Sequence, residues 1–163
     1  GRVVRIIRIN PGDSLYAQEV ALREQVLLRP LGLDFRRFVE LFPGYEDRFE
    51  HFVAVFDHPA GQRVIGCVLL LPDEPERGVG KLMQMAVDPQ RQGEGLGRRL
   101  VVELECRGFG ELGLRELYCH AQRGAKGFYE KLGWVREGEE FSEAGIPHVK
   151  MVLVAPDEEE GLD

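Results

Sequence analysis

A short glycine-rich loop between a strand and a helix constrains the fold of this chain more than any other feature of its sequence. The loop is Gln92-Gly93-Glu94-Gly95-Leu96-Gly97, and it follows the apolar segment 81–87, which we predict to be a strand. Helical spacing begins at the loop and continues as an apolar stripe of Leu96, Leu100 and Leu104. A glycine turn that opens a helix leaves backbone N–H groups unpaired at the positive end of the helix dipole. The sequence therefore predicts a site for phosphate oxygens at this loop.

The loop differs from two common nucleotide-binding loops. A triphosphate-binding loop would end in Gly-Lys-Ser or Gly-Lys-Thr, whereas this one ends in Gly97-Arg98-Arg99. A dinucleotide-binding loop would have G-x-G-x-x-G spacing, whereas the glycines here stand at alternate positions. A turn that binds no ligand and carries surface arginines is the alternative. Arg91, Arg98 and Arg99 favour an anionic ligand, because they add a local positive field to an acidic protein.

The remaining pattern predicts one domain that contains both strands and helices. The chain has 163 residues, of which 44% are hydrophobic, enough for a sizeable core. We expect this domain to span residues 1–156 and the acidic tail at 157–163 to be disordered. Apolar and β-branched runs predict strands at residues 2–9, 49–56, 64–71, 81–87, 115–121 and 149–153. Helical spacing predicts helices at residues 14–29, 35–42 and 123–132 and from residue 95 onward.

Charge, hydropathy and cysteine usage exclude several classes of protein. The 28 acidic and 21 basic residues give a formal net charge of −7, which argues against binding nucleic acid or an anionic membrane through the overall field. No apolar stretch approaches the roughly 20 residues that span a bilayer, and Arg5 and Arg8 interrupt the apolar run near the N-terminus, so we expect no export signal. Cys67, Cys106 and Cys119 form no C-x-x-C pair, which fits a reducing cytoplasm.

Three segments resemble signatures of one family. Val87-Asp88-Pro89 followed by Gln92-x-x-Gly95-x-Gly97 resembles the Q/R-x-x-G-x-G/A motif of the GNAT superfamily of acyl-CoA-dependent N-acetyltransferases. Further along the chain, Gln122-x-x-Ala125-x-x-Phe128-Tyr129-Glu130-Lys131-Leu132-Gly133-Trp134 is similar to the second signature, in which asparagine is usual at the first position and phenylalanine at the last. The closing Gly145-Ile146-Pro147-His148 resembles a small bacterial branch of that superfamily.

The resemblance implies an α/β (α+β) fold and a co-substrate, acetyl-CoA. Helices would flank a mixed, strongly twisted sheet in a single domain, and two parallel strands at residues 81–88 and 115–121 would splay apart to hold the acyl-CoA. The implied contacts with acetyl-CoA are Met85, Ala86 and Val87 for the pantetheine, Gln92, Gly93, Glu94, Gly95, Leu96, Gly97 and Arg98 for the pyrophosphate, and Gln122 and Tyr129.

Acyl transfer to an amine needs a neutral amine, a polarised thioester carbonyl and a proton for the departing thiolate. Backbone N–H groups of residues 85–87 are candidates to stabilise the oxyanion. Tyr129 lies beside an apolar stripe formed by Ala125, Phe128 and Leu132, and we predict that it protonates the thiolate; simple packing of its ring is the alternative. The candidates for the general base are Glu24, His51, His120 and His148.

Several other side chains have an ordinary structural explanation. Cys119 alternates onto the face opposite His120, so we expect a buried thiol and direct attack of the amine in a ternary complex, without an acyl-enzyme. Arg23 and Arg29 could bind an acidic part of the acceptor or could be solvated helix charges. Nothing in the histidine spacing requires a metal, and we expect none.

These features predict an N-acetyltransferase that uses acetyl-CoA and acts on a primary amine of a small molecule or a protein. A non-catalytic acyl-CoA-binding domain with a regulatory or sensor role is the alternative. We expect no nucleic-acid or membrane partner. An exposed last strand could pair two copies of the chain into a homodimer.

Overall fold

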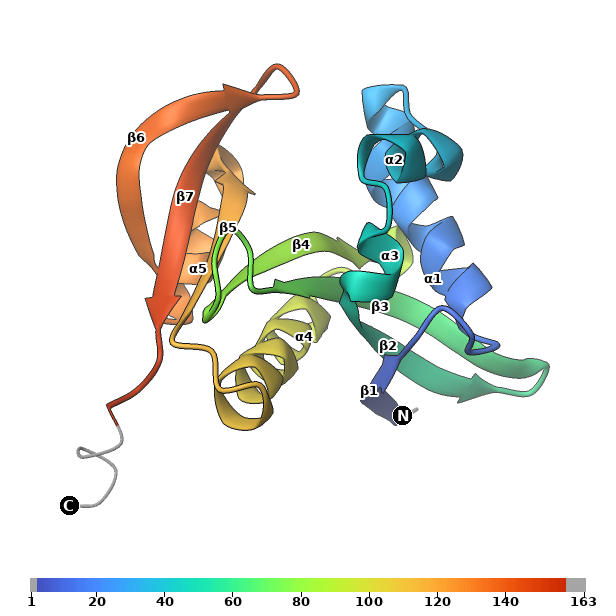
Figure 1. The fold of residues 1–163 in the computed structure, drawn as a ribbon. Helices are drawn as coiled ribbons and strands as arrows, with labels where there is room; N and C mark the ends of the chain where they lie inside the picture. The colour runs from blue at the N-terminus through green and yellow to red at the C-terminus, as the bar shows by residue number, and fades with distance from the viewer. Residues whose placement is uncertain (1–2, 158–163) are drawn as a thin grey trace. The chain divides into compact units, whose positions relative to one another are not determined.

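A mixed sheet of seven strands in the order β1-β2-β3-β4-β5-β7-β6 organises the chain (Figure 1). The computed structural model describes residues 3–157. The strands are β1 (Val4–Ile9), β2 (Glu50–His58), β3 (Gly61–Pro72), β4 (Val79–Val87), β5 (Glu116–Gln122), β6 (Val135–Glu143) and β7 (Ile146–Val154). The α-helices are α1 (Tyr16–Arg23), α2 (Phe35–Leu41), α3 (Tyr45–Arg48), α4 (Leu96–Glu105) and α5 (Lys126–Lys131). The predicted α/β class, with one domain-wide sheet flanked by helices, is confirmed.

The two strands that were expected to be parallel are parallel. The register of β4 with β5 runs from Val79 opposite Glu116 to Lys81 opposite Tyr118. Both strands continue beyond these pairs, β4 to Val87 and β5 to Gln122. The neighbouring pairs β1–β2, β2–β3, β5–β7 and β6–β7 are antiparallel.

The expectation that the last strand is exposed at a sheet edge is wrong. β7 pairs with β5 on one side and with β6 on the other, so the edge strands of the sheet are β1 and β6. The sequence could not show this, because the order of strands in a sheet depends on non-local pairing. The strand order therefore does not support a homodimer built through the last strand, and any edge pairing would use β1 or β6.

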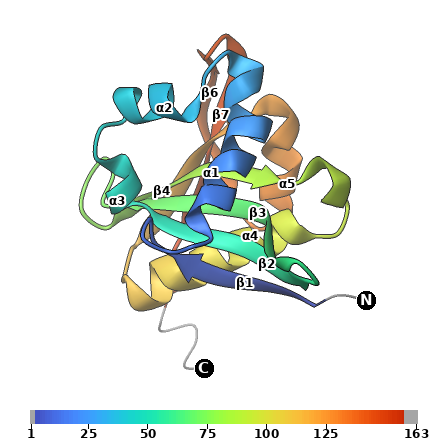
Figure 2. The ribbon, with the colours of Figure 1, turned by 90° about the vertical axis from the view of Figure 1, so that its right-hand side faces the viewer.

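The chain forms two compact units, and the first comprises the described parts of Gly1–Leu71 and Met83–Leu104. In this unit α1 covers one face of β1, β2 and β3, and α4 covers the other (Figures 1 and 2). The predicted stripe on α4 is confirmed, because Leu96, Leu100 and Leu104 are all buried. A side chain at Gly66 would place its Cβ 3.1 Å from Leu100 Cδ1, so this glycine permits the close approach of α4 to β3.

The second unit comprises Pro72–Leu82 and the described part of Glu105–Asp163. Strands β6 and β7 form a long hairpin in this unit (Figure 1). The stripe predicted for α5 is wrong in phase: Ala125, Phe128 and Leu132 are only half-buried, whereas Tyr129 is 4% exposed. A 3-10 turn at Arg123–Ala125 precedes α5, so Ala125 lies outside the α-helix and α-helical spacing cannot be counted from it.

The helical regions also differ from the sequence prediction. The first predicted helix is composite: α1 ends at Arg23, a π-helical turn follows at Glu24–Leu28, and a 3-10 turn at Arg29–Leu31 contains the proline. Helix α3 was not predicted, because four residues are too few to show a period. Among residues 3–157, no helix is long and apolar enough to cross a bilayer. Residues 158–163 lie outside the described residues, so the disorder expected for the tail stays a prediction.

Candidate active site

The glycine loop after β4 has the backbone geometry of an open cradle. Gly93 and Gly95 have φ angles of 84° and 76°, in the left-handed region that glycine adopts without strain. Apart from the glycine and its two chain neighbours, no heavy atom of residues 3–157 lies within 4 Å of the position that a Cβ would take at either residue. The side-chain amide of Gln92 donates to Val87 O at 3.2 Å and ties the loop to the end of β4. A ligand can therefore approach this backbone closely.

Helix α4 presents unpaired donors to this loop. The hydrogen bond that opens the helix runs from Arg99 N–H to Gly95 O, at 3.2 Å. The first N–H groups of a helix have no partner inside it, and here they belong to Leu96, Gly97 and Arg98. Leu96 is buried, so only its backbone can reach a ligand, whereas the Arg98 side chain is exposed. The predicted phosphate contacts, residues 92–98, are thus consecutive residues of the loop and of the first turn of α4.

The three arginines that flank the loop are not equivalent. Arg91 lies 3.6 Å from the Glu94 carboxylate and stacks on the Phe56 ring, 4.5 Å from its centroid. Arg99 donates to Val4 O at 2.8 Å. Arg98 makes no ion pair or hydrogen bond through its side chain with any of residues 3–157. Arg98 is therefore the arginine that remains available to an anion.

Strand β4 is irregular just before the predicted pantetheine contacts. Gln84 has a φ of 51°, which is unusual for a residue with a side chain and carries a cost of about 1–2 kcal/mol. Two contacts hold it: its side-chain oxygen accepts from Arg23 Nε at 3.2 Å, and its carbonyl oxygen accepts from Cys67 Sγ at 3.5 Å. Met85, Ala86 and Val87 follow directly, with Ala86 buried and the other two half-buried.

Four charged or titratable side chains form a buried network in the first unit, which we call the charge network: Glu19, Arg23, Glu46 and His51. Arg23 donates to Glu19 Oε2 at 3.0 Å and makes a two-pronged contact with the Glu46 carboxylate, with both distances 2.8 Å. Glu19, Arg23 and His51 are fully buried. Arg23 is therefore neither a solvated charge nor free to bind an acidic acceptor, and both alternatives for this residue are wrong.

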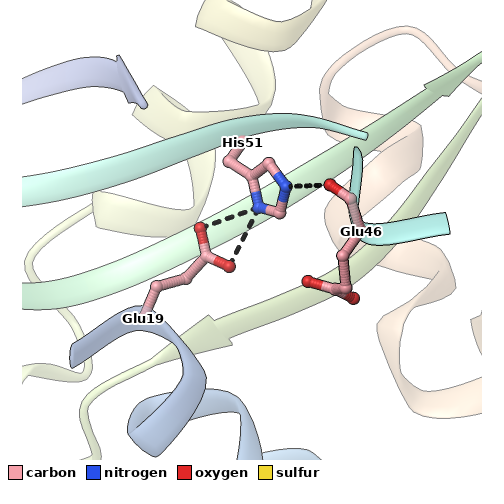
Figure 3. Close-up of side chains that lie close together, drawn as sticks. All are labelled: Glu19, Glu46 and His51. Carbon is pink, nitrogen blue, oxygen red and sulfur yellow. Dashed lines mark hydrogen bonds and ion pairs between the residues drawn. The ribbon is translucent and has the colours of Figure 1, made fainter. Parts of the chain in front are cut away.

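The ring of His51 has both nitrogens engaged by oxygen atoms (Figure 3). Nδ1 lies 3.0 Å from each Glu19 carboxylate oxygen, and Nε2 lies 2.8 Å from Glu46 O. Carboxylate and carbonyl oxygens only accept hydrogen bonds, so both nitrogens must donate and the ring is a cation. Burial alone would lower the pKa of His51, but the hydrogen bond and charge of Glu19 outweigh burial and raise it.

The oxygen and nitrogen atoms of Glu19, Glu46 and His51 are close enough together to suggest a metal site. The hydrogen bonds argue against that interpretation. Arg23 already occupies the space between the carboxylates as their counter-ion. A protonated His51 offers no lone pair to a metal. The group fits a structural ion network better than a metal centre.

The carboxylate of Glu24, another base candidate, is hydrogen-bonded to the backbone at the start of α2. Its Oε2 accepts from the backbone N–H of Phe35 at 2.8 Å, and its Oε1 lies 3.4 Å from Arg29 NH2. The carboxylate therefore supports the first residue of α2, and a quarter of the side chain is exposed.

A second histidine cluster lies in the second unit, around the β6–β7 turn. His120 Nδ1 lies 3.0 Å from Glu143 Oε1, and His148 Nε2 lies 3.6 Å from Glu143 Oε2. His148 Nδ1 donates to Ile146 O at 2.7 Å. The Phe141 ring contacts both imidazoles, with centroids 5.0 Å from His120 and 6.0 Å from His148. The structure thus brings two predicted base candidates together around one carboxylate.

Tyr129 and Cys119 form a buried pair on the opposite face of β5. Burial, followed by the charge and hydrogen bond of Cys119, raises the pKa of Tyr129 well above 10, so its hydroxyl stays protonated and donates to the sulfur. Burial also raises the pKa of Cys119 to about 12. The expected buried thiol at Cys119 is confirmed. Gln122 is exposed at the end of β5, opposite His148 in register.

Sequence reasoning missed three carboxylates of these clusters. Glu19 stands four residues before Arg23, the spacing of a helical ion pair, and that spacing was a usable signal. Glu143 lies next to the Gly145-Ile146-Pro147-His148 segment, which offered a weaker signal. Glu46 belongs to the unpredicted helix α3, and no local pattern marks it.

The chain belongs to the GNAT acetyltransferase family. A family model described as an acetyltransferase (GNAT) domain matches residues 44–155, which is well over half of the chain. A Bacillus subtilis (strain 168) protein, provisionally named as an acetyltransferase, is 43% identical over 72 residues, 44% of this chain and 48% of that protein. The matched segments span less than half the length of the curated relatives.

Solved structures with low sequence identity share the fold. A protein from Lactobacillus plantarum, provisionally described as an N-acetyltransferase, has a TM-score of 0.76 and 22% identity, over 94% of this chain and 99% of that one. An acyl-CoA N-acyltransferase from Pseudomonas aeruginosa has a TM-score of 0.70 and 19% identity, over 93% and 99% of the two chains. At these identities the likeness concerns the fold alone.

Proposed function

We propose that this protein transfers an acetyl group from acetyl-CoA to a primary amine of a small molecule or a protein. The observation that carries the proposal, beside family membership, is the open loop at Gly93 and Gly95, with its unpaired N–H groups at the start of α4. Acetyl-CoA is the co-substrate, and its thioester supplies the activated acetyl group. Its pyrophosphate would accept from backbone N–H groups of residues 92–98, and Arg98 would pair with a phosphate.

The pantetheine would lie along Met85, Ala86 and Val87, with a further contact from Gln122. The left-handed residue Gln84 supports this assignment, because it breaks the regular strand directly before these residues and redirects their backbone groups. A free N–H of residues 85–87 would stabilise the oxyanion that forms at the thioester carbonyl.

The reaction is a direct transfer in a ternary complex. The amine nitrogen attacks the carbonyl carbon, the C–N bond forms, and a proton of the amine passes to His120 Nε2. The C–S bond then breaks, its electron pair stays on sulfur, and the Tyr129 hydroxyl gives the thiolate its proton. Solvent returns the proton from His120 to Tyr129. The products are the N-acetyl amine and free CoA thiol.

The choice of groups follows from their surroundings. His51 has no free lone pair, and Glu24 is bound to the α2 backbone, so neither is suited to accept a proton. Cys119 has a pKa raised to about 12 by burial, which disfavours a thiolate nucleophile and an acyl-enzyme. Tyr129 already donates to one sulfur atom, and exchanging this bond for one to the CoA sulfur would make it the acid.

The test is release of free thiol from acetyl-CoA in the presence of a panel of primary amines, with mass spectrometry of the products. We expect one amine to gain the mass of an acetyl group as thiol appears. Tyr129→Phe should lower kcat about 100-fold. Tyr45→Phe, a matched loss of a hydroxyl outside the site, should not. If acetyl-CoA raises the melting temperature but no amine is acetylated, the regulatory or sensor role replaces the enzyme.

The loop assignment has a matched test of its own. Gly95 and Gly32 have nearly equal φ angles, 76° and 75°, and a Cβ at either meets no heavy atom of the described chain within 4 Å, apart from the adjacent residues. Alanine at either position should therefore cost a similar amount of stability, about 1 kcal/mol. Gly95→Ala should raise the KM for acetyl-CoA about 10-fold, because a Cβ obstructs the phosphate. An equal KM in both variants would remove the loop from the cofactor site.

Three broader expectations belong to the same proposal. The closing Gly145-Ile146-Pro147-His148 supports placement in the small bacterial branch that shares this ending. The free cysteines, two buried and one exposed, support a cytoplasmic protein. A homodimer would be detected by sedimentation, and any edge pairing in it would involve β1 or β6.

A further inference from the structure

The turn between β6 and β7 places a carboxylate beside His120. Ala144 and Gly145, the two residues of the turn, have φ angles of 52° and 74°, the geometry of a two-residue hairpin turn with both residues left-handed. Such a turn fixes the register of the hairpin, and here it pairs Glu143 with Ile146. Glu143 therefore stands at a defined point at the end of β6, from which its carboxylate reaches the imidazole of β5.

The hydrogen bond between these side chains determines where the imidazole keeps its lone pair. An ionised carboxylate only accepts, so Nδ1 of His120 carries the hydrogen of the 3.0 Å contact with Glu143 Oε1. In a neutral ring the lone pair is then on Nε2. Nε2 of His120 makes no hydrogen bond with any of residues 3–157, and 28% of the side chain is exposed. The ring is thus held with its basic nitrogen free.

His148 lies near the Glu143 carboxylate but takes no part in the hydrogen bond between His120 and Glu143. Its Nδ1 donates to Ile146 O within the hairpin, which fixes the orientation of its ring. The 3.6 Å between its Nε2 and Glu143 Oε2 is too long for a good hydrogen bond. Its ring stacks on Phe141 with an interplanar angle of 27°, and Phe141 in turn contacts His120 edge-on. The closing segment of the sequence therefore fixes the surroundings of His120.

We propose that Glu143 is a positioning residue for acetyl transfer, which holds His120 in the tautomer whose Nε2 accepts the proton of the amine. This inference rests on the proposed function, in which His120 is the base. Without the carboxylate the ring can rotate and can carry its hydrogen on either nitrogen, so part of the population presents no base. Loss of an orienting partner of this kind lowers activity about 10- to 100-fold.

The first experiment measures the tautomer and needs no activity. Protein labelled with ¹⁵N-histidine is examined by two-dimensional NMR at slightly alkaline pH, with the His120 signal assigned by its loss in His120→Gln. We expect the Nδ1–H tautomer in the wild type and a mixture in Glu143→Ala. Glu143→Gln, whose amide oxygen still accepts, should keep the wild-type tautomer. An unchanged His120 tautomer in Glu143→Ala would overturn the proposal.

Glu137→Ala is the matched control. Glu137 lies on the same strand, is 57% exposed against 48% for Glu143, and pairs with Lys150 at 3.0 Å. It should leave the His120 tautomer unchanged. A change as large as that in Glu143→Ala would show a general disturbance of β6 and would contradict a specific role for Glu143.

The second experiment is kinetic and uses the amine identified by the transfer assay. Glu143→Ala should lower kcat about 10- to 100-fold with an unchanged KM for acetyl-CoA, and Glu143→Gln should restore most of the loss. The results distinguish a wrong assignment of His120 as the base from a wrong assignment of Glu143 as the positioning residue. Full activity in His120→Gln would remove His120 as the base, whereas an active-site His120 with a Glu143→Ala variant of normal kcat would remove only the positioning role.

Discussion

Two histidine–carboxylate pairs of this protein have the same contact distance and opposite chemical consequences. His51 Nδ1 lies 3.0 Å from Glu19, and His120 Nδ1 lies 3.0 Å from Glu143. The second nitrogen of His51 faces the carbonyl oxygen of Glu46, whereas the second nitrogen of His120 faces no acceptor among residues 3–157. His51 is fully buried and His120 is partly exposed.

The surroundings of the second ring nitrogen decide whether a histidine that is paired with a carboxylate can still accept a proton. With acceptors at both nitrogens, the ring of His51 is a cation that balances buried carboxylates. With one acceptor and one free nitrogen, the neutral ring of His120 is oriented and keeps a lone pair on Nε2. A short distance to a carboxylate is therefore poor evidence for catalysis by itself. Three predictions test the difference between the two pairs.

The largest effect is expected in the charge network. Arg23→Met removes the guanidinium that is shared by Glu19 and Glu46, and leaves two carboxylates with the single positive charge of His51. The free energy of unfolding should fall by about 3–5 kcal/mol, measured by urea denaturation. Arg36→Met, at an arginine whose side chain is 89% exposed, should change it by no more than about 0.5 kcal/mol. Equal losses of unfolding free energy in both variants would mean that the charge network stabilises the protein no more than an exposed ion pair does.

The second prediction sets the two histidines against each other. His51→Gln should lower the free energy of unfolding by about 3 kcal/mol, because Glu19 loses a buried ionic partner. His120→Gln should alter stability by less than about 0.5 kcal/mol but lower acetyl transfer about 100-fold or more. Melting curves and thiol release measured on both variants give the four values. Equal changes in stability and in acetyl transfer for the two variants would contradict the different roles assigned to His51 and His120.

The smallest effect is the pH dependence of stability due to His51. Because the pKa of His51 is raised in the folded protein, its contribution is complete below the unfolded value of about 6.5 and is lost as pH rises through the folded value. The free energy of unfolding should therefore decline above about pH 6.5, by at most about 1.4 kcal/mol per pH unit from this group. The difference between wild type and His51→Gln isolates the effect, and His120→Gln should retain it. A difference that stays constant with pH would show that His51 is not charged in the fold.

Local patterns predicted much of the fold because they act over short distances. The stripe of Leu96, Leu100 and Leu104 follows from helical periodicity alone, and all three are buried as expected. The face of α5 that is buried was predicted wrongly, because periodicity does not show which side of a short helix the rest of the protein covers, and Tyr129 is the residue that is buried. Helix α3 and the place of β7 inside the sheet depend on packing and pairing partners far away in the sequence.

The candidate site divides in the same way. The family-like motifs, the glycine loop and the residue types that could act as acid or base can all be recognised in the sequence, because these are properties of a few consecutive residues. The hydrogen-bond partners and the burial of each candidate become known only from the folded protein. Arg23 joined Glu46, His51 joined Glu19, and His120 joined Glu143 across separations of 23, 32 and 23 residues. The protonation of a side chain depends on the acceptors and the burial around it, and folding brings these together from segments that no local pattern connects.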